Sequence, residues 1–229
     1  MDFAGFAALT FDCYGTLVDW ETGLLAALRP ILRAHARDLT DQQLLDLYGD
    51  LEPRAQVPYQ TYRQVLAAVV RGLGERLGFQ ASQAEAESLA ASLPDWPLFP
   101  DTRAALQRLK TRYRLAIVSN IDDDLFAGTA RHLGIGFDAV ITAQQARAYK
   151  PSPAPFLLAL ERLHLPRERV LHVGQSVFHD VVPARSLGLA TVLVTRRGFG
   201  ATRPSGGEPD LKVPDLQTLA RLAVGPPPR

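Results

Sequence analysis

The sequence predicts an α/β protein in which a helical segment interrupts a parallel β-sheet. From residue 101 onward, short continuous apolar runs alternate with helical patterns, which is typical of a parallel sheet covered by helices on both faces. A further apolar run lies at residues 6–11, and the chain between the two regions shows mainly helical periodicity. We therefore expect a doubly wound, Rossmann-like core, residues 1–17 and 98–229, with an inserted α-helical cap domain, residues 18–97.

The first strand, predicted over residues 6–11, ends in Asp12. A carboxylate at the end of a core strand is costly unless it is paired or used. We expect Asp12 to be a nucleophile that forms a covalent ester; the alternative is that it only caps a turn. Gly15 permits a sharp turn, and Thr16 supplies a hydroxyl that can orient the carboxylate. Strand alternation is expected to turn Cys13 into the core.

The cap region, residues 21–93, predicts helices and hardly any strand. Apolar stripes at helical spacing mark three of them, over residues 24–32, 44–47 and 62–77. Gly78 is expected to end the third helix. Ser82 and Glu85 form a capping-box pattern that starts a fourth. Three prolines within residues 94–100 cannot continue a helix, so this stretch is expected to lead back to the core.

The remaining core is predicted as helices that alternate with strands. The expected helices cover residues 101–112, 122–134, 153–164 and 180–188, and the expected strands cover residues 115–118, 139–141, 170–173 and 191–194. Residues 198–210 are rich in Gly and Pro and are expected to form a loop. A last helix is expected over 216–222, followed by a frayed tail, 225–229.

Polar side chains follow several of these strands. In open parallel sheets, ligands bind outside the carboxyl ends of the strands. The candidates at these ends are Asp12, Ser119, Asn120, Lys150, Gln175, Ser176, His179 and Asp180. We expect Lys150 to keep Asp12 ionised and to neutralise charge in the transition state; the alternative is an exposed surface lysine. Asp180 is expected either to take part in catalysis or only to favour a helix start.

The other histidines carry no ligand spacing. His172 lies within a predicted strand and is expected to pack in the core or at its edge, whereas His35, His132 and His164 are expected on the surface of helices. None of these four residues enters the predicted site.

Composition limits the classes of function. The formal net charge of the 229 residues is +1, which excludes a strong electrostatic footprint for nucleic acid or a membrane surface. Cys13 is the single cysteine, so no intramolecular disulfide is expected, which suits a reducing cytosol. No signal-peptide pattern or membrane-length apolar run is found. We expect a cytoplasmic protein that acts on a small molecule, without nucleic-acid or membrane partners.

Together, these motifs resemble the haloacid dehalogenase (HAD) superfamily. The resemblance rests on the order of the Phe11–Leu17 loop, an inserted helical cap, Ser119, Lys150 and a final acidic loop. Tyr14 makes the loop similar to the L-2-haloacid dehalogenase branch. Further segments resemble the members that open azetidine-2-carboxylate, namely residues 19–23, 96–97, 99–102, 119–122, 142–144, 149–151 and 179–180.

The resemblance implies a hydrolase that acts through an aspartyl ester on a small 2-substituted carboxylate, by dehalogenation of a 2-haloacid or by opening of azetidine-2-carboxylate. It implies catalytic roles for Asp12, Thr16, Lys150 and Asp180. It implies substrate binding by Tyr14, Ser119, Asn120, Ser176 and His179. The cap aromatics Trp20, Tyr48 and Tyr59 are candidates for an apolar lining. No cofactor is implied, and a homodimer is left open because related enzymes are often dimers.

The sequence also departs from the superfamily pattern. Most members are magnesium phosphatases with carboxylates where this chain has Tyr14 and Gln175. Magnesium prefers anionic oxygen ligands, so these positions argue against a metal. The halide-binding cap arginine of the branch falls at Tyr48 or Gly49, with Arg54 out of register.

Two further positions differ from the branch, because Ser176 and Phe156 replace an asparagine and a tyrosine. A magnesium-dependent phosphatase acting on a small phosphate ester, or a non-catalytic protein on this fold, remain the alternatives.

Overall fold

The computed structural model describes residues 1–196 and 205–225, and within them the chain forms a parallel six-stranded sheet. The strands are β1 (Ala8–Phe11), β2 (Arg114–Ser119), β3 (Ala139–Thr142), β4 (Val170–Gly174), β5 (Ala190–Val194) and β6 (Leu211–Val213). They lie in the order β3-β2-β1-β4-β5-β6, and every neighbouring pair is parallel. The sheet grows to opposite sides of β1, so β1 is the switch point at which ligands are expected to bind.

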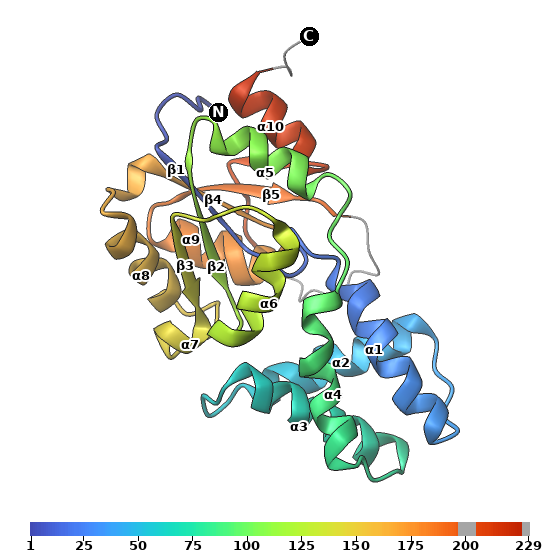
Figure 1. Ribbon diagram of the computed structural model, residues 1–229. Helices are drawn as coiled ribbons and strands as arrows, with labels where there is room; N and C mark the ends of the chain where they lie inside the picture. Colours follow the sequence, from blue (N-terminus) through green and yellow to red (C-terminus); the bar gives the residue numbers. More distant parts are fainter. Residues whose placement is uncertain (197–204, 226–229) are drawn as a thin grey trace.

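Helices cover both faces of the sheet (Figure 1). The helices of this part of the chain are α5 (Thr102–Lys110), α6 (Asp123–Leu133), α7 (Ala143–Ala146), α8 (Ala154–Leu163), α9 (Val182–Ser186) and α10 (Leu216–Val224). Leu9, Phe11 and Ile117 share one buried cluster with residues of α5, α6 and α10. Ala8 and Val118 share a second cluster with α8 and α9. Successive strand residues thus enter opposite layers, which confirms the predicted doubly wound α/β fold.

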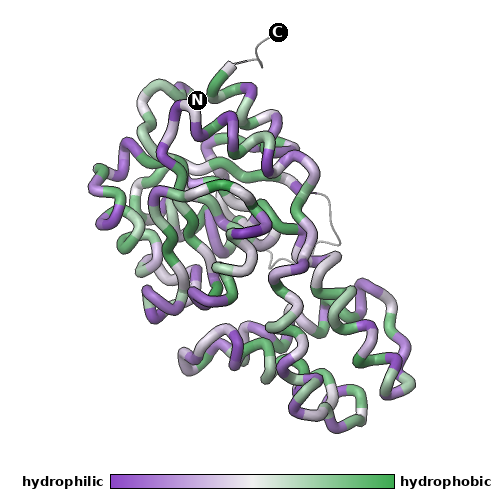
Figure 2. The backbone as a smooth tube through the Cα atoms, viewed as in Figure 1, coloured by the Kyte–Doolittle hydropathy of each residue, from purple (hydrophilic) through white to green (hydrophobic). Residues whose placement is uncertain are grey.

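The cap helices lie between β1 and α5 in the sequence and form a separate lobe at the lower right of Figure 1. They are α1 (Trp20–Ala34), α2 (Asp41–Ala55), α3 (Tyr62–Leu77) and α4 (Gln83–Ser92), followed by a short 3₁₀ helix, Leu93–Asp95. In Figure 2, green and purple alternate along α1, α2 and α3, as expected for helices with one apolar and one polar face.

Local sequence explains where the cap helices begin and end. The capping box predicted at Ser82 and Glu85 is present, and Gly78 ends α3 with a φ of 74°. Two further capping boxes, with Thr40 and Thr61 as the capping residues, start α2 and α3. Three of the four cap helices therefore begin with reciprocal side-chain and backbone hydrogen bonds.

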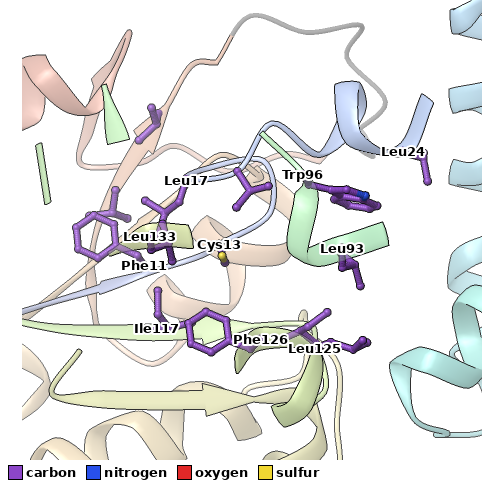
Figure 3. Close-up of a cluster of buried hydrophobic side chains, with 14 of the residues drawn as sticks. Phe11, Cys13, Leu17, Leu24, Leu93, Trp96, Ile117, Leu125, Phe126 and Leu133 are labelled. Atoms are coloured by element: carbon purple, nitrogen blue, oxygen red, sulfur yellow. The ribbon is translucent and has the colours of Figure 1, made fainter. Parts of the chain in front are cut away.

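The two chain segments that join core and cap are bonded to each other. Val18 and Leu98 form an isolated antiparallel bridge, and the Asp19 amide donates to the Pro97 carbonyl at 2.8 Å. Beside them, Leu17 and Trp96 enter the buried cluster drawn in Figure 3. This pairing ties the end of the cap to the loop that carries Asp12.

Several predicted elements differ from the structure. Strand β6 and helix α7 follow short, weakly periodic stretches and were not predicted. The helix predicted over 180–188 is instead a π-helical turn, Val177–Val181, that continues into α9. Residues 198–204 of the predicted loop and 226–229 of the predicted tail lie outside the described residues. Within the described part of the chain, no helix is long and apolar enough to cross a membrane.

Candidate active site

A pocket lies where the carboxyl ends of β1, β2 and β4 meet the cap. Its volume is about 880 Å³, counted out to its opening into solvent. Core residues that line it are Asp12, Tyr14, Ser119, Asn120, Lys150, Gln175, Ser176, His179 and Asp180. Cap and linker residues that line it are Trp20, Tyr48, Gly49, Glu52, Pro53, Tyr62, Leu93 and Trp96. The sheet edge and the cap therefore enclose one common space.

The Lys150 ammonium group connects two carboxylates at the base of this pocket. Its Nζ donates to Asp12 Oδ1 at 2.8 Å and to Asp180 Oδ1 at 2.6 Å. The Lys150 side chain is only 2% exposed, so the interpretation as a surface lysine is wrong. The Asp12 side chain keeps 12% of its surface exposed, and it lines the pocket.

Asn120 holds Lys150 in place through the backbone. The Lys150 amide donates to Asn120 Oδ1 at 2.7 Å, and Asn120 Nδ2 donates to the Lys150 carbonyl at 3.1 Å. Both polar atoms of the Asn120 side chain are used in this way. Asn120 therefore positions Lys150; it also lines the pocket, and its role in binding the substrate carboxylate stays a prediction.

Thr16 holds the second oxygen of Asp12. Its hydroxyl donates to Asp12 Oδ2 at 2.8 Å and accepts from the Gln175 amide at 2.9 Å. The loop after β4 therefore supports the carboxylate through Thr16.

Asp180 is held by β4 and the turn that follows it. The Ser176 amide donates to Asp180 Oδ2 at 3.1 Å, and His172 Nε2 lies 3.3 Å from Asp180 Oδ1. On its other side, His172 Nδ1 lies 2.9 Å from the hydroxyl of Thr10, its partner across the parallel pair β1–β4. His172 is buried and its ring packs edge-on against Phe156, so the predicted core packing is confirmed. Its polar contacts were not predicted, and a histidine inside an otherwise apolar strand was the available signal for them.

The two carboxylates differ in their electrostatics. Burial and the charge of Asp180 raise the pKa of Asp12, against the opposing effect of Lys150. Although burial opposes ionisation, Lys150 and His172 hold the pKa of Asp180 well below its ordinary range. Burial likewise works against the Lys150 charge, but the two carboxylates outweigh it and raise the lysine pKa. Asp180 is therefore the more firmly ionised partner.

Ser119 presents an unused hydroxyl to the pocket. The residue is 2% exposed, and its Oγ has no hydrogen-bond partner among the described residues. A buried hydroxyl without a partner is costly unless a ligand satisfies it. By contrast, the Ser176 hydroxyl accepts from the His179 amide at 3.0 Å and lies 3.2 Å from His179 Nδ1, so these two residues form a local turn.

Aromatic rings form much of the wall of the pocket. Tyr14 packs edge-on against Trp96 with ring centres 5.9 Å apart, while its hydroxyl lies 2.7 Å from the Thr129 hydroxyl. Tyr14 thus presents its ring to the pocket. Trp20 and Tyr48 line the wall, as predicted from the sequence. Tyr59 does not line the pocket. Its ring packs against that of Tyr149, with the ring centres 5.4 Å apart.

Sequence reasoning missed several cap residues of the pocket. Tyr62 starts α3 and Trp96 follows the 3₁₀ helix, and both line the pocket together with Glu52 of α2. Arg54 is not among the lining residues: it is exposed and pairs with Asp50 at 2.7 Å. The cap thus supplies a carboxylate to the pocket, whereas its nearby arginine faces solvent.

The residues at the base of the pocket do not fit a magnesium ion. Each oxygen of Asp12 and Asp180 already accepts a hydrogen bond, from Lys150, Thr16 or the Ser176 amide. Magnesium is held by carboxylates whose negative charge is available to it, whereas both carboxylates here are bonded to the Lys150 ammonium, whose positive charge repels a cation. The described residues contain no group of three or more His, Cys, Asp or Glu side chains that could hold a metal.

Several known proteins are similar to this chain over most of its length. Haloacetate dehalogenase H-2 of Moraxella sp. (strain B) is 28% identical over 221 residues, which cover 94% of this chain and 96% of that protein. The structure of L-2-haloacid dehalogenase from Xanthobacter autotrophicus superposes with a TM-score of 0.81 at 25% identity, covering 96% of this chain and 99% of that chain. Probable phosphatase IndB of Dickeya dadantii (strain 3937) is 30% identical over 193 residues, 81% of this chain and 79% of that protein.

The relatives therefore include both dehalogenases and a probable phosphatase. The model of the haloacid dehalogenase-like hydrolases matches residues 6–188, which is most of the chain and spans β1, the cap and β4. By this match, the chain belongs to the haloacid dehalogenase-like hydrolases.

Proposed function

We propose that this hydrolase acts on a small 2-substituted carboxylate through a covalent ester at Asp12 and needs no metal. The observation that carries the proposal is the buried Lys150 ammonium, bonded to both Asp12 and Asp180 beside an aromatic-lined pocket. A positioned ammonium supplies the charge balance that a divalent cation supplies in phosphoryl transfer. The dehalogenases among the relatives point to the same substrate class.

In the first step, an oxygen of Asp12 attacks carbon 2 of the substrate and the bond to the leaving group breaks. Lys150 and Thr16 hold the attacking carboxylate in a fixed orientation. The unpartnered Ser119 hydroxyl is proposed to donate to the substrate carboxylate. The aromatic walls limit the access of bulk water to the reacting groups.

In the second step, water attacks the carbonyl carbon of the Asp12 ester, releases a 2-hydroxy acid and restores the carboxylate. Asp180 and His179 line the same pocket and are proposed to orient the water and receive its proton. Since the pKa of Asp180 is held low, it is a weak base by itself, and His179 is proposed to share the transfer.

Single-turnover reaction in heavy-oxygen water tests this mechanism. With an excess of enzyme over azetidine-2-carboxylate or 2-chloropropionate, the first turnover should place one heavy oxygen on Asp12, detected by peptide mass analysis. Asp12→Asn should lower turnover by at least about a thousandfold, because the nucleophile is lost. A product that carries the heavy oxygen while Asp12 stays unlabelled would show direct attack by water and refute the covalent route.

A further inference from the structure

We infer that Asp122 of the core is a positioning residue that holds the cap closed over the pocket, because its carboxylate caps the first turn of the cap helix α3. The inference rests on the proposed function, in which a closed pocket keeps bulk water from the reaction at Asp12. Its basis is a set of bonds between core and cap that lie beside the pocket.

The Asp122 carboxylate caps a helix of the cap instead of its own helix. Asp122 occupies the N-cap position of α6, where an aspartate ordinarily accepts from the first turn of the same helix, but its side chain makes no such bond. Its Oδ1 accepts from the Tyr62 amide and its Oδ2 from the Arg63 amide, each at 2.9 Å. The residue is only 3% exposed. A buried core carboxylate is thus bonded to the start of a cap helix.

The first turn of α3 depends on this carboxylate. Thr61 is the N-cap of α3, and its hydroxyl accepts from the amide of Gln64, the third helical residue. The amides of the first two residues, Tyr62 and Arg63, can find no acceptor within their own helix. Asp122 supplies both acceptors, and its negative charge lies at the positive end of the α3 dipole. Separation of cap and core at this place would break both bonds together.

Tyr149 makes a further bond at the same place. Its hydroxyl donates to the Gln60 carbonyl at 2.8 Å, and its ring packs against that of Tyr62 with the ring centres 6.0 Å apart. The Arg63 guanidinium also pairs with Asp124 at 2.6 Å, but both side chains are exposed, so this pair contributes little. Asp122 and Tyr149 of the core thus form a noncovalent joint with residues 60–63 of the cap.

This joint and the covalent linkers hold the cap at two places. The linkers are bonded to each other at Val18 and Leu98, next to Trp96 in the chain. Tyr62, at the joint, and Trp96, at the linkers, line the same pocket. A cap held by covalent linkers at one place and by noncovalent bonds at another opens at the noncovalent bonds. The bonds of Asp122 therefore shift the equilibrium of the cap toward the closed state.

Tryptophan fluorescence tests this role without any substrate. The chain has two tryptophans, Trp20 and Trp96, and both line the pocket. Asp122→Ala should raise the quenching constant for acrylamide at least about twofold, because loss of the helix cap increases the open population. Asp215→Ala is the matched control: it removes the carboxylate that caps α10, where Asp215 accepts from the Thr218 amide at 2.6 Å, and should leave the quenching constant unchanged.

Two results of this measurement would overturn the inference. One is an equal quenching constant in the wild type and a folded Asp122→Ala protein. The other is a rise of the same size in Asp215→Ala, which would show that quenching follows stability and not closure. If Asp122→Ala does not fold, Tyr149→Phe takes its place, since it keeps the ring and removes only the bond to the Gln60 carbonyl. It should raise the quenching constant about 1.5-fold, and no rise would refute the joint.

Turnover separates this inference from the proposed function. With whichever of azetidine-2-carboxylate and 2-chloropropionate reacts, Asp122→Ala should raise KM at least about fivefold and change kcat less than about twofold, because bound substrate favours the closed state again. Asp122→Asn should restore most of the wild-type KM, since asparagine also caps helices well. A lower kcat with an unchanged KM would mean that Asp122 acts through the neighbouring Asn120 and Lys150, contrary to the inference. If quenching rises as expected but the wild type reacts with neither substrate, the proposed function is refuted and the role of Asp122 in closure stands.

Discussion

Lys150 holds together groups that come from three different strand ends. Its ammonium reaches Asp12 after β1 and Asp180 after β4, while Asn120 after β2 binds its backbone. When Asp12 becomes an ester, it loses its charge, and Asp180 remains to balance the ammonium. The second carboxylate thus lets Lys150 stay charged through both steps of the proposed reaction.

The raised pKa of Asp12 predicts where activity is lost on the acidic side of the pH profile. In the proposed reaction Asp12 must be ionised to attack, so kcat/KM should fall as the pH falls through its pKa. Because burial and Asp180 raise that pKa above the ordinary value of 3.8, the loss should begin at a higher pH than for an exposed aspartate. The charged groups that set this pKa are Lys150 and Asp180. A pH profile of kcat/KM measures it.

Removal of the Asp180 carboxylate tests whether Asp12 is the group that titrates. Asp180→Asn removes the negative charge that raises the pKa of Asp12, so the acid limb of the residual activity should move to lower pH. An acid limb at the same pH in both proteins would assign that titration to another group.

Prediction at the residue scale succeeded where residue type and position agreed. A strand followed by an aspartate and then a threonine predicted that Asp12 and Thr16 act together. In the structure the Thr16 hydroxyl donates a hydrogen bond to Asp12 Oδ2 at 2.8 Å. The same reasoning assigned Asn120 to the substrate and His172 to packing. In the structure Asn120 bonds to the Lys150 backbone, and His172 contacts Asp180 and, across the β1–β4 pair, Thr10. These contacts depend on strand register and loop packing, which a single sequence does not state.

At the scale of elements, the start of α1 packs closely against Trp96 at the end of the cap. Gly23 is buried in α1, and a Cβ at that position would lie 2.3 Å from Trp96 Cγ. Trp96 in turn lines the pocket and contacts the Tyr14 ring. A side chain at residue 23 would therefore move the wall of the pocket as well as the helix packing.

Gly23→Ala should destabilise the protein by about 1–3 kcal/mol, because the added methyl group overpacks the contact with Trp96. The direction of the change in stability is informative, because a glycine-to-alanine substitution at an uncrowded position inside a helix stabilises by up to about 1 kcal/mol. Urea unfolding gives the free energy. Gly5→Ala, where a Cβ would meet nothing within 4 Å, is the control and should change stability little. A Gly23→Ala protein as stable as the wild type would show that Trp96 moves aside freely.

Helices were easier to predict than the last strand. Repeated apolar spacing and capping residues are local signals, and α3 and α4 follow them from start to end. Strand β6 has only three residues, Leu211–Val213, and forms because β5 offers an open edge beside it. An edge strand of this length carries no periodic signal of its own.

At the scale of the whole molecule, the strand order decides where chemistry can occur. β1 lies between β2 and β4, so Asp12 faces the polar ends of both neighbours. The cap follows β1 directly and returns to it through the Val18–Leu98 bridge, which places cap residues over the same edge. Related hydrolases with this architecture include a probable phosphatase and dehalogenases, so the fold by itself does not select a reaction.

Metal removal distinguishes the two kinds of reaction in this family. Because Lys150 supplies the positive charge at Asp12, treatment with EDTA should leave the turnover of a 2-substituted carboxylate unchanged within about twofold. Added magnesium should not produce turnover of p-nitrophenyl phosphate. The proposal fails if EDTA abolishes activity and magnesium restores it, and magnesium-dependent cleavage of the phosphate ester would identify a phosphatase.

The sequence by itself determined the α/β class, the inserted helical cap and the family, because periodicity, capping residues and motif order are properties of the chain. It also singled out Asp12, Thr16, Lys150 and Asp180. Only the tertiary structure decided which atoms meet: that Lys150 is buried between two carboxylates, that Asn120 holds Lys150, and that Glu52 faces the pocket. The physical reason is that these contacts join residues far apart in the chain, and their geometry depends on strand register and on the docking of the cap.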